Sequence, residues 1–107
     1  MRQGRAANAI PVLERLAALY PAEPAISRLL AYALRHEQRY GEADALFSAA
    51  VIRSPRDLAL RFGQAQTRYE LGLPAARLFA KAQELAPADL EITRNRALAL
   101  VSEGDHA

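Results

Sequence analysis

The sequence repeats itself with a period of 32 to 34 residues. Pro21, Pro55 and Pro87 mark the repeat, and each is preceded at matching distances by an alanine and two further apolar residues. The equivalent residues are Ala9, Leu13 and Leu16, then Ala43, Phe47 and Ala50, then Ala75, Phe79 and Ala82. Repetition at this period is typical of solenoid proteins, in which each unit buries its apolar face against its neighbours.

Each repeat is predicted to contain two helices. Ala43, Phe47 and Ala50 lie at i, i+4 and i+7, which places them on one face of a helix. The alanines allow two helix backbones to approach closely, and the phenylalanine fills the space between helix pairs. Pro55 then ends this helix, because proline lacks an N–H and disfavours helical conformation in the residue before it. The other helix carries an alanine ten residues after each proline, namely Ala31, Ala65 and Ala97.

The composition supports an all-α chain, since 24 alanines and 16 leucines, both strong helix formers, make up much of its 107 residues. We expect six antiparallel helices near residues 5–20, 24–38, 42–54, 57–71, 74–86 and 89–103. Asp57 and Asp89 are placed to cap two helix N-termini, and Pro74 suits a first turn. Pro11 predicts either a kinked first helix or a later start near Ile10.

This pattern resembles the tetratricopeptide repeat. The family's small, alanine, aromatic, alanine and proline positions are held in the second unit by Ala31, Ala43, Phe47, Ala50 and Pro55. The chain departs from the family where a bulky aromatic residue is usual, and those places hold Ser27, Arg61 and Thr93. The resemblance implies a right-handed α–α superhelix in a single domain, residues 1–107.

The resemblance also divides the domain into a half repeat at 1–21, full repeats at 22–55 and 56–87, and a half repeat at 88–107. Because of this register we expect a fragment of a longer bacterial array, with a natural half-repeat cap as the alternative. In a fragment, Leu98, Leu100 and Val101 lose a partner helix, and exposed apolar surface of that kind favours self-association.

The first helix of each repeat lines a concave groove in the family that the sequence resembles. Carried onto this chain, the predicted groove residues are Arg28, Tyr32, Arg35, His36, Phe62, Gln66, Tyr69 and Arg94. Tyrosine and arginine are enriched at interface hot spots, and arginine pairs with carboxylates. The alternative is that Phe62 and Tyr69 belong to the core. The carboxylate clamp of chaperone-binding members is not expected, because only Arg28 among the matching residues has suitable chemistry.

The sequence offers little for catalysis. It has no cysteine and only two histidines, of which His36 is placed to complement a helix dipole at a C-terminus. Metal-ligand spacings and phosphate-binding glycine loops are missing, so we expect no enzyme activity, cofactor or metal. Basic residues are scattered among 12 acidic ones, which argues against nucleic-acid binding. The sequence has neither a secretory signal nor a stretch of 18 apolar residues, so we expect no membrane contact and a cytoplasmic protein.

These observations predict a non-catalytic protein–protein interaction module that presents its groove to a peptide or helix of a partner of unknown identity. One alternative is an accessory arm of a larger bacterial enzyme, because residues 73–92 loosely resemble repeats fused to sulfotransferase or oxygenase domains. A less favoured alternative is an RNA-binding helical repeat that stacks bases on arginine and aromatic side chains.

Overall fold

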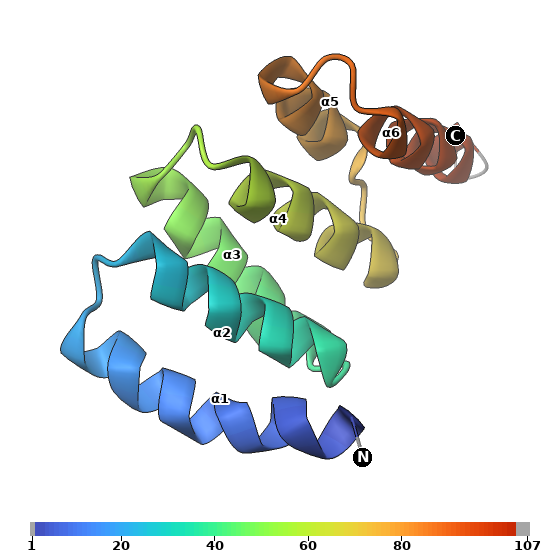
Figure 1. Ribbon diagram of the computed structural model, residues 1–107. Helices are drawn as coiled ribbons and strands as arrows, with labels where there is room; N and C mark the ends of the chain where they lie inside the picture. Colours follow the sequence, from blue (N-terminus) through green and yellow to red (C-terminus); the bar gives the residue numbers. More distant parts are fainter. Residues whose placement is uncertain (1, 105–107) are drawn as a thin grey trace.

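The structure is a computed structural model that describes residues 2–104 of the chain. It is all-helical over these residues, as the sequence predicts. The helices are α1 (Arg2–Leu19), α2 (Pro24–His36), α3 (Tyr40–Arg53), α4 (Leu58–Glu70), α5 (Ala76–Leu85) and α6 (Leu90–Gly104). Each helix packs against the next, and α2·α4 and α4·α6 also touch. Figure 1 shows the resulting stack, with α1 and α6 at opposite ends, and the predicted helical solenoid is therefore confirmed.

Aspartates begin two of the helices, as predicted. The Asp57 carboxylate accepts a hydrogen bond from the backbone N–H of Leu60 at 3.1 Å, at the start of α4. The Asp89 carboxylate accepts from the N–H groups of Glu91 and Ile92 at 2.9 and 3.2 Å, at the start of α6. These bonds satisfy donors that the first turn of a helix leaves unpaired.

The structure contradicts one of the two alternatives for Pro11 and the prediction for Pro74. The first helix does not start near Ile10, because α1 runs from Arg2 to Leu19 with Pro11 inside it. Ile10 is buried against the next helices, and that packing supports a helix that proline alone would interrupt. Pro74 lies before α5 instead of in its first turn.

A side chain from another helix caps the start of α5. The carboxylate of Glu103, on α6, accepts hydrogen bonds from the N–H groups of Ala75 and Ala76 at 3.1 and 2.8 Å. These donors stand at the start of α5, whose own N-cap residue offers no side-chain bond. The cap therefore also ties the last two helices together.

The core follows the repeated residues. The sets Ala43, Phe47, Ala50 and Ala75, Phe79, Ala82 are all buried. The ring of Tyr32 meets Phe47 edge-on at 5.1 Å between centroids, and Phe62 meets Phe79 in the same way at 5.9 Å. One cluster joins α1 to α4 and a second joins α4 to α6. Each of the two full repeats thus has its two helices joined by an aromatic pair at favourable edge-to-face geometry.

The third alanine of the predicted first-helix series behaves differently from the other two. Ala31 and Ala65 are fully buried, whereas Ala97 is exposed and Ala99 is buried in its place. The reason is that Ala31 and Ala65 each face the second helix of their own repeat. The described residues contain no helix after α6 to cover Ala97.

No helix among the described residues has the length and apolar character that a membrane crossing requires.

Candidate functional site

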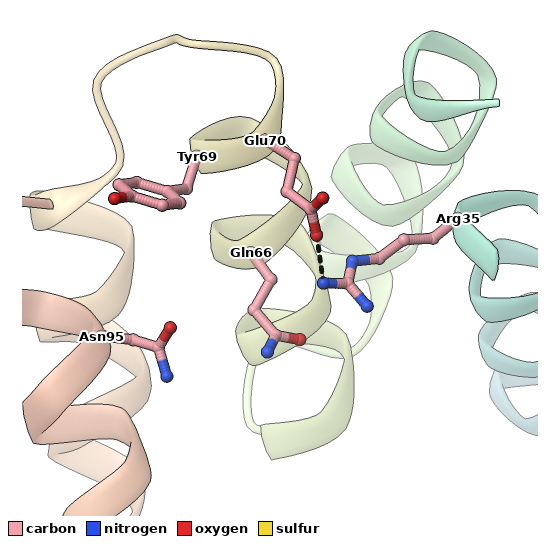
Figure 2. Close-up of a pocket in the computed structure, with 5 residues that line it drawn as sticks. All are labelled: Arg35, Gln66, Tyr69, Glu70 and Asn95. Carbon is pink, nitrogen blue, oxygen red and sulfur yellow. Dashed lines mark hydrogen bonds and ion pairs between the residues drawn. The ribbon is translucent and has the colours of Figure 1, made fainter. Parts of the chain in front are cut away.

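A hollow of about 350 Å³ opens where α2, α4 and α6 come together (Figure 2). We name it the three-helix hollow and define it by its lining residues, Arg35, Gln66, Tyr69, Glu70 and Asn95. The first comes from α2, the next three from α4 and the last from α6. The packing of α4 against both other helices therefore brings together side chains that are up to 60 residues apart in the sequence.

An ion pair forms one wall of the three-helix hollow. The guanidinium of Arg35 donates a hydrogen bond to the carboxylate of Glu70, which Figure 2 marks with a dashed line. The Nε atom of Arg35 is buried and has no hydrogen-bond partner among the described residues. The charge of Arg35 is thus already balanced by Glu70, but its hydrogen-bonding capacity is not used up.

Two carboxamides and one phenol occupy the rest of the three-helix hollow. Asn95 donates from Nδ2 to the backbone oxygen of Glu91 at 2.7 Å, which leaves its Oδ1 acceptor for other contacts. Gln66 is half-buried, and its side chain forms no hydrogen bond to any part of the chain that the structure describes. Tyr69 is 37% exposed. In Figure 2 the Gln66 and Asn95 side chains both lie beside the space below the Tyr69 ring.

The structure brings only three of the eight predicted groove residues to this hollow, namely Arg35, Gln66 and Tyr69. Arg28 donates to Asp57 at 2.6 Å across the α2–α4 contact. His36 is exposed at the end of α2, and Arg94 is exposed on α6. Because no ligand is present, the binding role of all these residues stays a prediction.

The two remaining predicted residues have structural contacts. The Tyr32 hydroxyl donates to the backbone oxygen of Ala59 at 2.7 Å, and burial raises the pKa of this hydroxyl above its ordinary value of 10.0. Phe62 is half-buried against Phe79, as the alternative core assignment has it. Tyr69 differs from Phe62, since its ring remains accessible at the hollow.

Glu70 and Asn95 line the hollow but are not among the eight predicted residues. The sequence does carry a signal for Glu70, because Arg28–Asp57 and Arg35–Glu70 are separated by 29 and 35 residues. Both separations are close to one repeat, as expected for ion pairs that join neighbouring first helices. Asn95 has no such signal, since its place in the hollow depends on how α6 rotates against α4.

The site offers no arrangement for catalysis by metals. Among residues 2–104, no group of three or more histidine, aspartate and glutamate side chains stands close enough to hold a metal ion. The ion pairs instead link successive helices, and their carboxylates already have cationic partners. The side chains that line the hollow can form hydrogen bonds and apolar contacts, which suits recognition of another molecule.

Comparison with known families identifies the first part of the chain. A family model described as tetratricopeptide repeat matches residues 1–60. The matched part is more than half of the chain and contains α1, α2, α3 and the first residues of α4. A comparison with curated proteins finds no match.

Proposed function

Because the chain belongs to the tetratricopeptide-repeat family, we propose that it is a non-catalytic protein-binding module that holds an extended segment of a partner in a groove along α2, α4 and α6. Proteins of this family generally bind other proteins. The observation that carries the finer proposal is the three-helix hollow, where unpaired hydrogen-bonding groups surround an accessible aromatic ring. Its volume of about 350 Å³ is at the small end of ligand pockets and suits a short stretch of peptide.

The chemistry of the three-helix hollow favours peptide backbone over an acidic side chain. A carboxamide has both a donor and an acceptor, so Gln66 and Asn95 can each match an N–H and a C=O group of an extended chain. An incoming carboxylate would instead compete with Glu70 for Arg35, and with Asp57 for Arg28. We therefore infer that the partner segment is near neutral where it crosses the hollow.

Tyr69 supplies the apolar part of the contact. Tyrosine presents a large rigid surface at small entropic cost, which explains its enrichment at interface hot spots. Tyr69 lies near the C-terminal end of α4, and Leu71 and Leu73, which follow it in the sequence, are also exposed. We infer that an apolar or aromatic side chain of the partner packs on this ring while its backbone meets the carboxamides.

We further infer that the terminal helices support self-association. Val12 and Leu19 on α1 are 60% and 65% exposed, and Leu90 and Val101 on α6 are 83% and 65% exposed. None of these four side chains lines the three-helix hollow, so self-association and peptide binding use different residues.

The groove proposal is tested by selecting ligands from a displayed library of random linear peptides. We expect near-neutral peptides with an apolar anchor to be enriched on the wild-type chain. Gln66→Ala/Asn95→Ala should weaken their binding about tenfold, since two lost hydrogen-bonding groups correspond to about 1–3 kcal/mol. Gln83→Ala is the matched control, because it removes a carboxamide of α5 that lies outside the hollow.

Two results would contradict this proposal. Equal binding by wild type and Gln66→Ala/Asn95→Ala would show that the three-helix hollow is not the site. Failure to enrich any peptide on a correctly folded chain would remove the linear-peptide function itself.

A further inference from the structure

The last helix buries one face and leaves the opposite face apolar and open. Ile92 and Ala99 are each 1% exposed and lie on the inner side of α6. Leu90, Ala97 and Val101 are spaced by seven and four residues, so they form a stripe on the other side. We name this stripe the α6 outer face, and Leu98 and Leu100, both about half exposed, flank it.

On α4, the alanine equivalent to Ala97 is covered by a helix. Leu58, Ala65 and Tyr69 stand 32 residues before Leu90, Ala97 and Val101. Ala65 is fully buried and packs in a cluster with Ala75, Ala76 and Phe79 on the α5 side. The second helix of a repeat therefore covers Ala65, and the same holds for Ala31 where α2 packs on α3. Tyr69, the equivalent of Val101, remains accessible at the three-helix hollow.

By its place in the repeat, α1 corresponds to α3 and α5, which are the second helices of their repeats. Ala9, Leu13 and Leu16 of α1 align with Ala43, Phe47 and Ala50 of α3. α1 packs on α2, the first helix of the following repeat, but on no first helix of its own repeat in the described residues.

α1 consequently has an open apolar stripe of its own. Ala9, Val12, Leu16 and Leu19 lie at i, i+3, i+7 and i+10, which is one helical face. Ala9 and Leu16 are half-buried, and Val12 and Leu19 are exposed. We name these four residues the α1 outer face.

We propose that the α6 outer face of one molecule packs against the α1 outer face of a second copy, so that the two helices complete one repeat between molecules. This inference rests on the proposed self-association and gives it a geometry. An antiparallel arrangement, as within each repeat, places the C-terminal end of α6 beside the N-terminal end of α1, where the helix dipoles attract. Figure 1 shows α1 and α6 at opposite ends of the stack, so one molecule does not satisfy both faces by itself.

The contact joins two different surfaces, so it does not close into a symmetric dimer. A head-to-tail contact of this type continues into rings or open filaments. Each face presents a single helix stripe of a few apolar side chains, which corresponds to an interface below about 1,200 Å², the range of weak and transient contacts. Association should therefore depend on concentration and proceed beyond the dimer.

Sedimentation velocity over a concentration series tests the proposal on the 107-residue chain. The wild type should exceed twice the 11.7 kDa monomer mass as concentration rises. Leu90→Glu/Val101→Glu blocks the α6 outer face, and Val12→Glu/Leu19→Glu blocks the α1 outer face. Each variant alone should remain monomeric, with a helical circular dichroism spectrum, since all four positions are exposed.

Mixing the two variants is the decisive arm. Each still has the face that the other lacks, so the mixture should form a dimer of one copy of each and nothing larger. Ile52→Glu is the control, because Ile52 is 81% exposed on α3, outside both outer faces, and its replacement should leave association unchanged.

The results that overturn the proposal differ from those that overturn self-association in general. A wild type that stays monomeric at every concentration contradicts both. Self-association of the α1-face variant by itself, or a mixture that remains monomeric, contradicts only the head-to-tail geometry. Peptide binding in the three-helix hollow is measured separately, and neither result alters its test.

Discussion

Replacing Gly63 by alanine adds one methyl group where α4 lies against Phe47 of α3 and Tyr32 of α2. A Cβ at this position would fall inside 3.0 Å of ring carbons Cε1 and Cζ of Phe47 and would reach 3.0 Å from the hydroxyl oxygen of Tyr32. Phe47 is 0% exposed, and the edge of the Tyr32 ring already rests against it. The phenylalanine ring therefore has no free volume into which it can withdraw.

Two effects of opposite sign decide the outcome of Gly63→Ala. Alanine is preferred over glycine inside a helix by about 1 kcal/mol. Overpacking of a filled core costs about 1–3 kcal/mol and occasionally more, and a contact this short places Gly63 at the upper end. We expect the free energy of unfolding to fall by about 2 kcal/mol, which corresponds to a decrease in Tm of roughly 10 °C for a domain of this size.

Urea unfolding followed by circular dichroism measures this change, with Gly41→Ala as the matched control. Gly41 also lies in a helix, but a Cβ there would meet nothing within 4 Å. Gly41→Ala should leave stability unchanged or raise it by up to about 1 kcal/mol. Equal effects of the two substitutions would refute the close approach of Gly63 to Phe47.

A double-mutant cycle separates the clash from other effects of the new methyl group. Phe47→Leu makes room at the place that the methyl group would occupy. Gly63→Ala should therefore cost less in the Phe47→Leu background than in the wild type, and residues in contact couple by about 0.5–3 kcal/mol. The same cost in both backgrounds would mean that the Phe47 ring is not what Gly63 accommodates.

Three further predictions concern single side chains. Glu103→Ala should lower the free energy of unfolding by about 1 kcal/mol in urea unfolding, since it removes the cap on α5, and an unchanged value would contradict that role. Gln38→Gly should raise the free energy of unfolding by about 1 kcal/mol in thermal unfolding, because Gln38 has a φ of 62° that glycine adopts more easily. Gly72→Ala, at a φ of 76°, should lower it, and a lower value for Gln38→Gly would contradict this explanation. Burial raises the pKa of Tyr32, so the contribution of its neutral hydroxyl to stability is present below about pH 10 and is lost as pH rises through the folded-state pKa. Tyr32→Phe should therefore make the free energy of unfolding fall less steeply above about pH 10. An equally steep fall in the variant would contradict this role.

Most of the fold follows from the sequence because helix packing restricts which residues can meet. The sets Ala43, Phe47, Ala50 and Ala75, Phe79, Ala82 were predicted to pack, and all six residues are buried. Small residues where helices cross and a large one between them leave few alternatives at this spacing. The Asp57 and Asp89 caps are equally local, so the sequence also predicts them correctly.

The details that the sequence did not predict depend on contacts between distant helices. The Glu103 cap joins α6 to α5, and no local pattern around Glu103 indicates it. The exposure of Ala97 depends on the helix that covers its face and not on its own neighbours in the sequence. Pro11 is tolerated inside α1 because tertiary packing of residues such as Ile10 supports that helix.

The candidate site shows the same division. Arg35, Gln66 and Tyr69 come together because the period of the repeat aligns the first helices. Arg28 is held by Asp57, and Phe62 packs on Phe79. Both contacts join different helices or their caps, and the repeat pattern does not predict them. The repeat period thus places the first helices in one layer, while individual contacts decide which side chains remain accessible on it.

Backbone chemical shifts of the chain, recorded with and without a selected peptide, show where the partner segment lies. The largest shift changes should occur in α2, α4 and α6 around Arg35, Tyr69 and Asn95. These changes should disappear with Gln66→Ala/Asn95→Ala and persist with Gln83→Ala. Changes confined to α1, α3 and α5 would contradict the claim, because they would place the partner on the opposite side of the solenoid.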